Sequence, residues 1–420
     1  FPVPEYADHV WHRYFVPGGK TGREAFLAID MPGAEPSDEW QALVVVANFV
    51  EVFLAREGHG HPVGINYLEK IQTPHLPSLY GAMLAGVEYV LMGAGIPMRI
   101  PGVLDRLARH EPATYPLAVT GAGPDEPATL TFDPQAFLGR ALPPLTRPKF
   151  LAIIASDVLA QTLVRKANGR VDGFIVEGPT AGGHNAPPRG ARQLNARGEP
   201  IYGPRDIVNL EKLKGLGLPF WLAGGAGSPE GLRAAIAQGA EGVQLGTAFA
   251  MCADSGLRGD LRRALLKRVA DGTAEVTTNA AASPTGFPFK VASLDGTLSD
   301  PAVGAARPRV CDLGYLREAY RTDEGGVAFR CPAEPVNVFV AKSGHADQTD
   351  GRSCICNALM ATAGLPQVRA GKWVEPPIVT MGDDLAGVGR FLPPGAADYT
   401  AADVVTRLMA GIEPRPGTDC

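Results

Sequence analysis

The sequence is poor in cysteine, in net charge and in long hydrophobic runs, and each shortage excludes a class of protein. Six cysteines in 420 residues are too few for a disulfide scaffold and suit a reducing compartment, so we expect a cytoplasmic protein. A net charge of -5 provides no basic surface for nucleic acid. No run of about 18 apolar residues occurs, so we expect no membrane span.

Several common catalytic and nucleotide-binding motifs are also absent. No G-x-G-x-x-G follows the first predicted strand, and neither G-x-x-x-x-G-K-[ST] nor G-x-S-x-G occurs. These absences argue against a Rossmann dehydrogenase, a P-loop NTPase and a serine hydrolase. The first residue is Phe1 and no signal-peptide pattern follows it, so we expect the chain to begin partway into a longer protein.

Three glycine-rich stretches follow short apolar runs, at residues 174–176, 220–223 and 243–245. They read E-G-P-T-A-G-G-H-N, A-G-G-A-G-S-P-E and L-G-T-A-F. Apolar runs that break into glycine are typical of parallel strands whose carboxyl ends carry loops built for close approach to a ligand. We therefore expect the function to lie at these three loops.

Six strand–helix units are predicted from the hydrophobic pattern. The strands are expected at 61–66, 89–92, 150–155, 173–176, 220–223 and 241–247, and the helices at 38–56, 77–85, 103–110, 158–167, 206–216 and 228–239. Nearly continuous apolar strands indicate a parallel sheet buried on both faces. We expect an α/β fold, a TIM (β/α)8 barrel whose first strands are missing from this chain; the alternative is an open, doubly wound sheet.

Two further parts complete the predicted organisation. Short strands at 115–121 and 128–132 indicate a hairpin insertion at about 115–132 within a barrel domain of residues 1–274. Residues 275–420 are expected to form a C-terminal cap of helices and loops, with helices at 315–320, 357–363 and 401–410. Cys311, Cys331, Cys354 and Cys356 lie in this cap without the C-x2-C pairs that mark most metal sites, so we expect buried free cysteines and no metal. A zinc or iron–sulfur site is the alternative.

The last two glycine loops are candidates for a phosphate site. In a barrel, backbone N–H groups of such loops and a helix N-terminus face the anion. Gly224, Gly225, Gly246 and Thr247 are the candidate residues, with the Thr247 hydroxyl as an extra donor. The plainer interpretation is that these glycines only let the strands turn tightly.

His184 is the candidate for chemistry, because it follows Gly182 and Gly183 at the end of a strand and its pKa lies near working pH. The two glycines leave space for a flat ring. Asn66 offers a donor and an acceptor to the edge of a heterocycle. Weaker candidates are Lys70, Tyr202 and Arg205.

Together the three loops resemble those of the nitronate monooxygenases, which are FMN-dependent TIM barrels. P-V-G-I-N at 62–66 and S-P-T-G-F-P at 283–288 look like further landmarks, so the resemblance covers roughly residues 60–290. It implies FMN as the cofactor, with His184 at the substrate. The residues that it places on the flavin are Asn66 and Gln244 toward the ring or ribityl chain, Gly182 and Gly183 against the ring, and Gly224, Gly225, Gly246 and Thr247 on the phosphate.

The implied reaction is oxidation of a nitronate by dioxygen to a carbonyl compound and nitrite. The wider superfamily contains FMN-dependent enoyl reductases, so an enoyl thioester reduced with NAD(P)H is the alternative, and a non-catalytic flavin-binding subunit is a third. The sequence leaves open whether the protein forms a homodimer. The chain departs from the family at Thr180, where an acidic residue is usual, at Asn185 and Ala186, and in lacking the A-P-M-type first strand.

Overall fold

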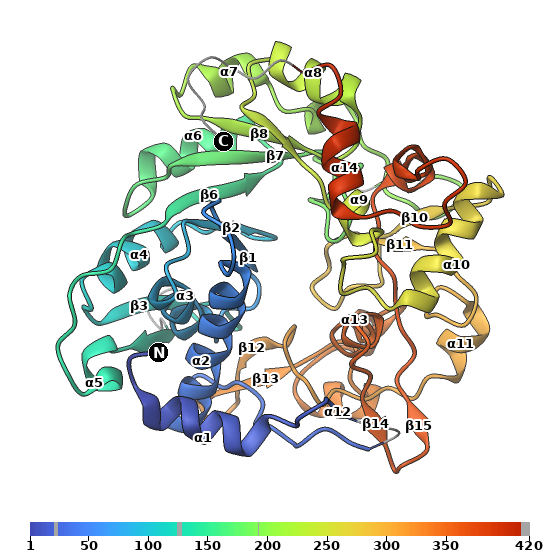
Figure 1. Ribbon diagram of the computed structural model, residues 1–420. Helices are drawn as coiled ribbons and strands as arrows, with labels where there is room; N and C mark the ends of the chain where they lie inside the picture. Colours follow the sequence, from blue (N-terminus) through green and yellow to red (C-terminus); the bar gives the residue numbers. More distant parts are fainter. Residues whose placement is uncertain (21–23, 124–127, 192, 413–420) are drawn as a thin grey trace.

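The computed structural model describes residues 1–20, 24–123, 128–191 and 193–412, which surround a curled parallel sheet (Figure 1). The sheet has six strands in the order β1-β2-β6-β7-β8-β9, and all five neighbouring pairs are parallel. The strands are β1 (Gly64–Leu68), β2 (Tyr89–Gly93), β6 (Lys149–Ile154), β7 (Gly173–Glu177), β8 (Phe220–Ala223) and β9 (Gly242–Gln244). The parallel α/β fold is therefore confirmed. Within the described residues β1 and β9 do not pair, so closure into an eight-stranded barrel stays a prediction.

Helices cover the outer face of the sheet. They are α2 (Asp38–Ala55), α3 (His75–Leu84), α4 (Ile100–Ala108), α6 (Asp157–Lys166), α7 (Leu210–Lys214) and α8 (Pro229–Ala237). The helix predicted over 206–216 is divided, because a 3-10 turn, η1 (Pro204–Asp206), precedes the shorter α7. Side-chain caps fix the starts of two helices: Ser156 accepts from the Leu159 N–H, and Ser228 accepts from the Gly231 N–H.

The alternation of side chains along β6 explains why its sequence is apolar from Phe150 to Ile154. Phe150 and Ile154 point into the main core between sheet and helices, where both are almost completely buried. Leu151 and Ile153 point to the opposite, concave face and join a smaller cluster with Ile175. Burying a side chain of the size of phenylalanine contributes about 1.5–3 kcal/mol, so both faces favour this strand.

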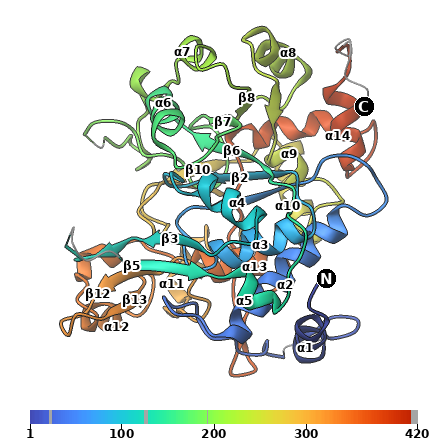
Figure 2. The same cartoon turned by 90° about the vertical axis from the view of Figure 1, so that its left-hand side faces the viewer.

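The predicted hairpin insertion is confirmed: β3 (Ala113–Leu117) pairs antiparallel with β5 (Ala128–Phe132). Part of the predicted link between them, residues 124–127, lies outside the described residues. The short strand β4 (Val119–Thr120) pairs in parallel with β12 (Glu318–Arg321). Figure 2 shows β3 and β5 lying alongside β12 and β13 (Val327–Arg330), so the insertion joins the C-terminal part of the chain.

The helix predicted at 315–320 is wrong, because the strand β12 occupies Glu318–Arg321. Ala319 and Tyr320 are buried by pairing with β13 on one side and β4 on the other, and these partners are distant in sequence. The predicted helices at 357–363 and 401–410 are confirmed as α13 (Ile355–Thr362) and α14 (Ala401–Leu408).

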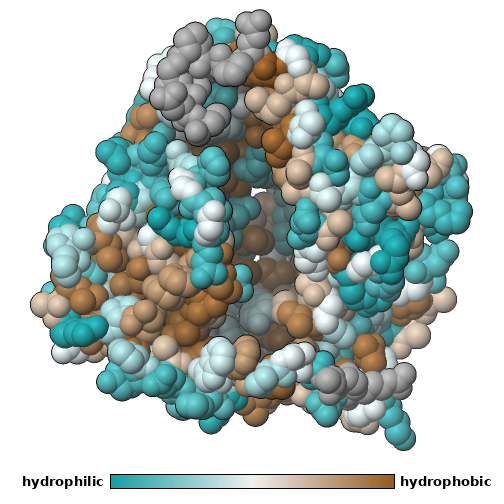
Figure 3. All heavy atoms as spheres, in the orientation of Figure 1, coloured by the Kyte–Doolittle hydropathy of each residue, from teal (hydrophilic) through white to brown (hydrophobic). Residues whose placement is uncertain are grey.

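The remaining elements lie at the N-terminus, between β5 and β6, and in the C-terminal third. They are α1 (Pro4–Tyr14), α5 (Pro134–Leu138), α9 (Thr247–Ala250), α10 (Gly259–Ala270), β10 (Val276–Asn279), β11 (Phe289–Ala292), α11 (Pro301–Ala306), α12 (Val336–Ala341), η2 (Ala346–Thr349), β14 (Val368–Arg369), β15 (Trp373–Val374) and η3 (Asp383–Phe391). The C-terminal elements stand opposite the concave face of the sheet and leave a hollow in the middle of the molecule (Figures 1 and 3). The described helices include none with both the length and the apolar composition to cross a bilayer. The domain boundary at residue 274 stays a prediction.

Candidate functional site

A cavity of about 540 Å³ lies where the carboxyl ends of the sheet strands meet the C-terminal elements. Figure 3 shows the hollow that contains it, with hydrophobic residues along its walls. Every predicted site residue lines this one cavity: Asn66, Gly182, Gly183, His184, Gly224, Gly225, Gln244, Gly246 and Thr247. These residues lie in or shortly after four strands, β1, β7, β8 and β9. The fold thus brings together positions that are up to about 180 residues apart in the chain.

The loop after β7 needs its two glycines for different reasons. Gly183 has a φ of +79°, which residues with a side chain rarely adopt. Gly182 is pressed against residues 381 and 382, so that an added Cβ would stand 3.0 Å from the Gly382 nitrogen. The Gly183 N–H donates to the Thr380 hydroxyl at 2.8 Å. The loop is therefore fixed from outside, and its backbone can face a ligand without side chains in the way.

The loop after β8 is held close to the loop after β7. Gly224 has a φ of +89°, and an added Cβ would stand 2.9 Å from both the Ala181 nitrogen and the Thr180 hydroxyl. Gly225 has a φ of +77°. The predicted tight turn is therefore present at both positions. This agrees equally with a phosphate site and with glycines that only let the strand turn tightly.

Gly246 and Thr247 differ from the other loop residues. Gly246 has a φ of -103°, and an added Cβ would meet no atom within 4 Å, so nothing in the fold itself requires glycine there. Thr247 begins α9 and its hydroxyl oxygen accepts from the Gly382 N–H at 2.8 Å. Its hydroxyl proton remains for a ligand, as expected if Thr247 is an extra hydrogen-bond donor to a phosphate.

His184 is oriented by a buried hydroxyl pair. Its Nε2 lies 2.7 Å from the Ser283 Oγ, which in turn lies 2.8 Å from the Thr285 hydroxyl and accepts from the Thr285 N–H. The Phe289 ring packs edge-on against the imidazole at 4.9 Å. Burial lowers the pKa of His184 to about 4, so the imidazole is uncharged at neutral pH.

The hydroxyl pair allows a tautomer of His184 that leaves a ring N–H for a ligand. The Ser283 proton can point either to His184 Nε2 or to the Thr285 oxygen. When it points to Nε2, the ring proton is on Nδ1, which has no hydrogen-bond partner in the described part of the chain. In that tautomer His184 presents a neutral N–H donor to a bound molecule.

Glu177 is a site residue that our sequence reasoning missed. It ends β7, seven residues before His184, and it lines both the central cavity and a second cavity of about 230 Å³ that His184 also lines. Burial raises the pKa of Glu177 to about 7, although a hydrogen bond from Asn185 opposes the shift. The acidic residue at the end of an apolar strand was the available signal.

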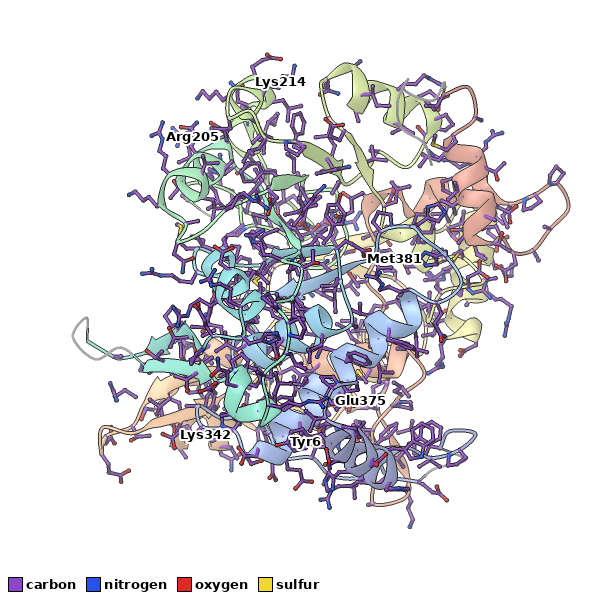
Figure 4. The ribbon with its side chains drawn as sticks, turned by 60° about the vertical axis from the view of Figure 1, so that its left-hand side comes forward. Tyr6, Arg205, Lys214, Lys342, Glu375 and Met381 are labelled. Carbon is purple, nitrogen blue, oxygen red and sulfur yellow. The ribbon has the colours of Figure 1, made fainter. Side chains whose placement is uncertain are left out.

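The weaker candidates lie outside the central cavity. Tyr202 lines the second cavity and donates to the Ala186 carbonyl at 3.1 Å. Arg205 is exposed at the outer edge of the molecule (Figure 4). The Lys70 ammonium lies over the Phe287 ring at 5.3 Å. The central cavity therefore receives no positive charge from Lys70 or Arg205, and Tyr202 does not line it either.

A second missed group comes from the C-terminal third of the chain. Residues 380–384, which we call the crossing segment, pass between the loops after β7 and β9, and Met381 lies inside the molecule (Figure 4). The other cavity-lining residues from this part are Phe289, Tyr315, Leu316, Ile355, Cys356, Leu359 and Met360. No local pattern marks them, since they reach the cavity only through long-range packing.

The cavity fits a flavin mononucleotide. Its volume lies in the range of about 300–1,000 Å³ that is usual for ligand sites. Side chains are missing at Gly182, Gly183 and Gly246, where a ring or a phosphate would approach the backbone. Asp384 also lines the cavity, and its carboxylate can accept from hydroxyl groups such as those of a ribityl chain.

Comparison with known proteins gives a family match for a third of the chain. Residues 147–284 match the family described as nitronate monooxygenase. The chain is 36% identical over 120 residues to a nitronate monooxygenase of Pseudomonas aeruginosa, which covers 29% of this chain and 32% of that protein.

Another relative has a different name. The chain is 32% identical over 127 residues to a Mycobacterium tuberculosis protein named (3aS,4S,5R,7aS)-5-hydroxy-7a-methyl-1-oxo-octahydro-1H-indene-4-carboxyl-CoA dehydrogenase, covering 30% of this chain and 32% of that protein. The matches thus span about a third of the length of these relatives. Among solved structures, a FabK mutant from Thermotoga maritima is similar with a TM-score of 0.44 and 15% identity, covering 87% of this chain and 86% of that chain.

Proposed function

Since residues 147–284 belong to the nitronate monooxygenase family, as the three glycine loops predicted, we propose that the protein is an FMN-dependent oxidoreductase that oxidises nitronates with dioxygen. One observation supports this most: nine residues chosen from separate parts of the sequence line a single cavity. The family match covers β9 and the loops after β7, β8 and β9, which together hold eight of those nine residues, all but Asn66.

In this proposal the backbone of the loops holds the cofactor. Gly182 and Gly183 face the ring, Gln244 and Asn66 lie toward the ring or the ribityl chain, and the loops after β8 and β9 receive the phosphate. Bound FMN would supply the redox chemistry, taking electrons from the substrate and passing them to dioxygen.

His184 would orient the substrate. A nitronate arrives already deprotonated, so no base is needed to form it, and a neutral histidine suits this task. With the Ser283 hydroxyl donating to Nε2, the Nδ1–H can donate to an anionic oxygen of the substrate. Ser283 and Thr285 are positioning residues, because they hold the imidazole ring in place without lining the cavity.

The second candidate, reduction of an enoyl thioester by NAD(P)H, is favoured by the apolar wall of the cavity. Among the residues that line the cavity are Ile71, Leu316, Ile355, Leu359 and Met360. An aliphatic wall suits an acyl chain, and one relative is named as acting on a carboxyl-CoA. The same wall would also suit an alkyl nitronate longer than the smallest ones.

An anaerobic absorbance titration of the purified protein separates the candidates. We expect the flavin band to bleach on addition of propionate 3-nitronate or an alkyl nitronate alone, and nitrite to form when dioxygen is admitted. Bleaching by NAD(P)H and none by any nitronate would replace the monooxygenase proposal with the reductase. A protein that binds no flavin, even when FMN is added, would overturn both; a protein that binds FMN but turns over neither substrate would indicate the non-catalytic subunit.

A further inference from the structure

Four of the six cysteines gather in one place in the C-terminal third of the chain. Cys331 and Cys354 are both 3% exposed and pack together, and the less buried Cys311 and Cys356 pack against them. They come from three segments: the loop after α11, the residue that follows β13, and the start of α13. All four are free thiols, and we call them the thiol cluster.

The surroundings of the thiol cluster are cationic, which is unusual for buried thiols that act only as small apolar side chains. Arg309 interacts electrostatically with Cys331, and Arg317 with Cys311 and Cys331. Neither arginine forms an ion pair with a carboxylate among the residues that the structure describes. Two partly buried positive charges therefore lie beside the sulfur atoms, together with the buried Glu334 carboxylate, which pairs with the Lys342 ammonium at 2.8 Å.

Arg309 also holds the three segments together. Its guanidinium donates to the carbonyls of Pro332, Glu334 and Thr349, so it ties the loop of Cys311 to the chain just after Cys331 and to the chain shortly before Cys354. In addition, the fully buried Asn357 amide donates to the Cys354 sulfur at 3.3 Å. N–H groups aimed at cysteine sulfur are among the features that tune sulfur-ligated metal clusters.

The arrangement does not suit a single ion. In the described residues, no three histidine, cysteine or acidic side chains are placed to hold one metal ion, as a zinc site would need. An iron–sulfur cluster takes one thiolate per iron and fills the centre with its own irons and sulfides, so its ligands need not converge on a single ion. With four thiolates an oxidised four-iron cluster carries a net charge of about -2, which the two arginines would balance.

We propose that Cys311, Cys331, Cys354 and Cys356 ligate a four-iron, four-sulfide cluster. Cys356 and its neighbour Ile355 line the central cavity, so the cluster would stand at the wall of the site already described. The proposal does not depend on the proposed function, since metal content is measured whether or not flavin is bound.

The test uses the full chain, produced with added iron and purified without oxygen. We expect about four irons and four acid-labile sulfides per chain, and a cluster signal in electron paramagnetic resonance after reduction with dithionite. The Cys354→Ala variant should lose at least tenfold of the iron. The matched control is Cys252→Ala, because Cys252 is equally buried but belongs to a different core, and it should keep its iron.

Three results would overturn the proposal. One is a wild-type chain that contains no iron or sulfide and takes up neither on anaerobic reconstitution with ferrous iron and sulfide. Another is stoichiometric zinc without sulfide. The third is equal loss of iron from the Cys354→Ala and Cys252→Ala variants, which would show that the iron is not held by the thiol cluster.

Discussion

At the scale of single residues, His184 carries the most direct prediction. The His184→Asn variant keeps a side-chain N–H but loses the imidazole ring that Ser283 orients, so we expect turnover to fall by about a hundredfold while the protein stays yellow. His110→Asn is the matched control, since His110 is also buried and hydrogen-bonded, to Tyr80, but does not line the cavity. Steady-state rates and flavin content are measured for both. Unchanged turnover in His184→Asn would remove this residue from the mechanism.

Glu177 gives a prediction about pH and stability. Its pKa is raised from an ordinary value near 4.5 to about 7, so the folded protein binds this proton more tightly than the unfolded chain does. The stability that comes from the protonated carboxyl is therefore present below pH 4.5 and is lost as pH rises through about 7. Glu177→Gln stays neutral, so relative to wild type we expect it to gain about 1–3 kcal/mol between pH 5 and pH 8.

The measurement is denaturant unfolding of both proteins at several pH values. Glu230→Gln, at the exposed start of α8, serves as the control and should show little change in the difference with pH. A stability difference for Glu177→Gln that is the same at pH 5 and pH 8 would show that Glu177 titrates normally.

Single residues also show how far the sequence leads. Most of the nine predicted residues, which line one cavity, were chosen because glycine at a strand end and a histidine beside it are local signals, whereas Gln244 came from the family resemblance alone. Ser283 belonged to a recognised landmark, but its contact with His184 spans 99 residues and could not be seen from either segment alone. Asn66 was expected at the end of a strand and lies in the middle of β1, yet it still lines the cavity.

At the scale of elements, the glycine loops make opposite predictions for two substitutions. Gly224→Ala would force a side chain into a φ of +89° and against Ala181 and Thr180, so we expect a loss of about 1–3 kcal/mol in stability. Gly246→Ala meets no atom of the fold and has a negative φ, so we expect normal stability. Its new methyl group enters the cavity, however, and should weaken FMN binding at least tenfold.

Thermal unfolding without flavin and FMN titration by fluorescence quenching distinguish the two variants. Gly203→Ala is the control for both, because an added Cβ there meets nothing and the residue lines neither this cavity nor the second one. Full FMN affinity in Gly246→Ala would mean that the loop after β9 does not contact the cofactor.

Elements also show which predictions depend on distant partners. The strands of the parallel sheet were predicted because each is apolar on both faces, a property of the strand itself. The segment 315–320 has no such pattern and was predicted as a helix; β12 forms there because β4 and β13 supply hydrogen-bond partners. The secondary structure of a short segment with mixed composition depends on the elements that pack against it in space. Local sequence patterns do not reveal which elements these are.

At the scale of the whole molecule, the predicted division at residue 274 can be tested by cooperativity. The parts before and after that residue are joined by β4 pairing with β12, by Thr380 accepting from Gly183, and by Thr247 accepting from Gly382. The crossing segment thus lines the cavity together with the loops after β7 and β9. We expect a single unfolding transition by calorimetry and by far-UV circular dichroism, because residues from both sides of residue 274, among them Leu265 and Val379, share one hydrophobic cluster.

Added FMN should then move that one transition as a unit. A ligand at a hundred times its Kd stabilises the folded state by about 2.7 kcal/mol, and since residues from both parts line the cavity, both must unfold to release it. Riboflavin, which lacks the phosphate, is the matched control and should give a smaller shift at the same concentration. The contrary result would be two separate transitions, with FMN shifting only the transition of residues 1–274. It would show that residues 275–420 fold independently and that the crossing segment contributes little to the site.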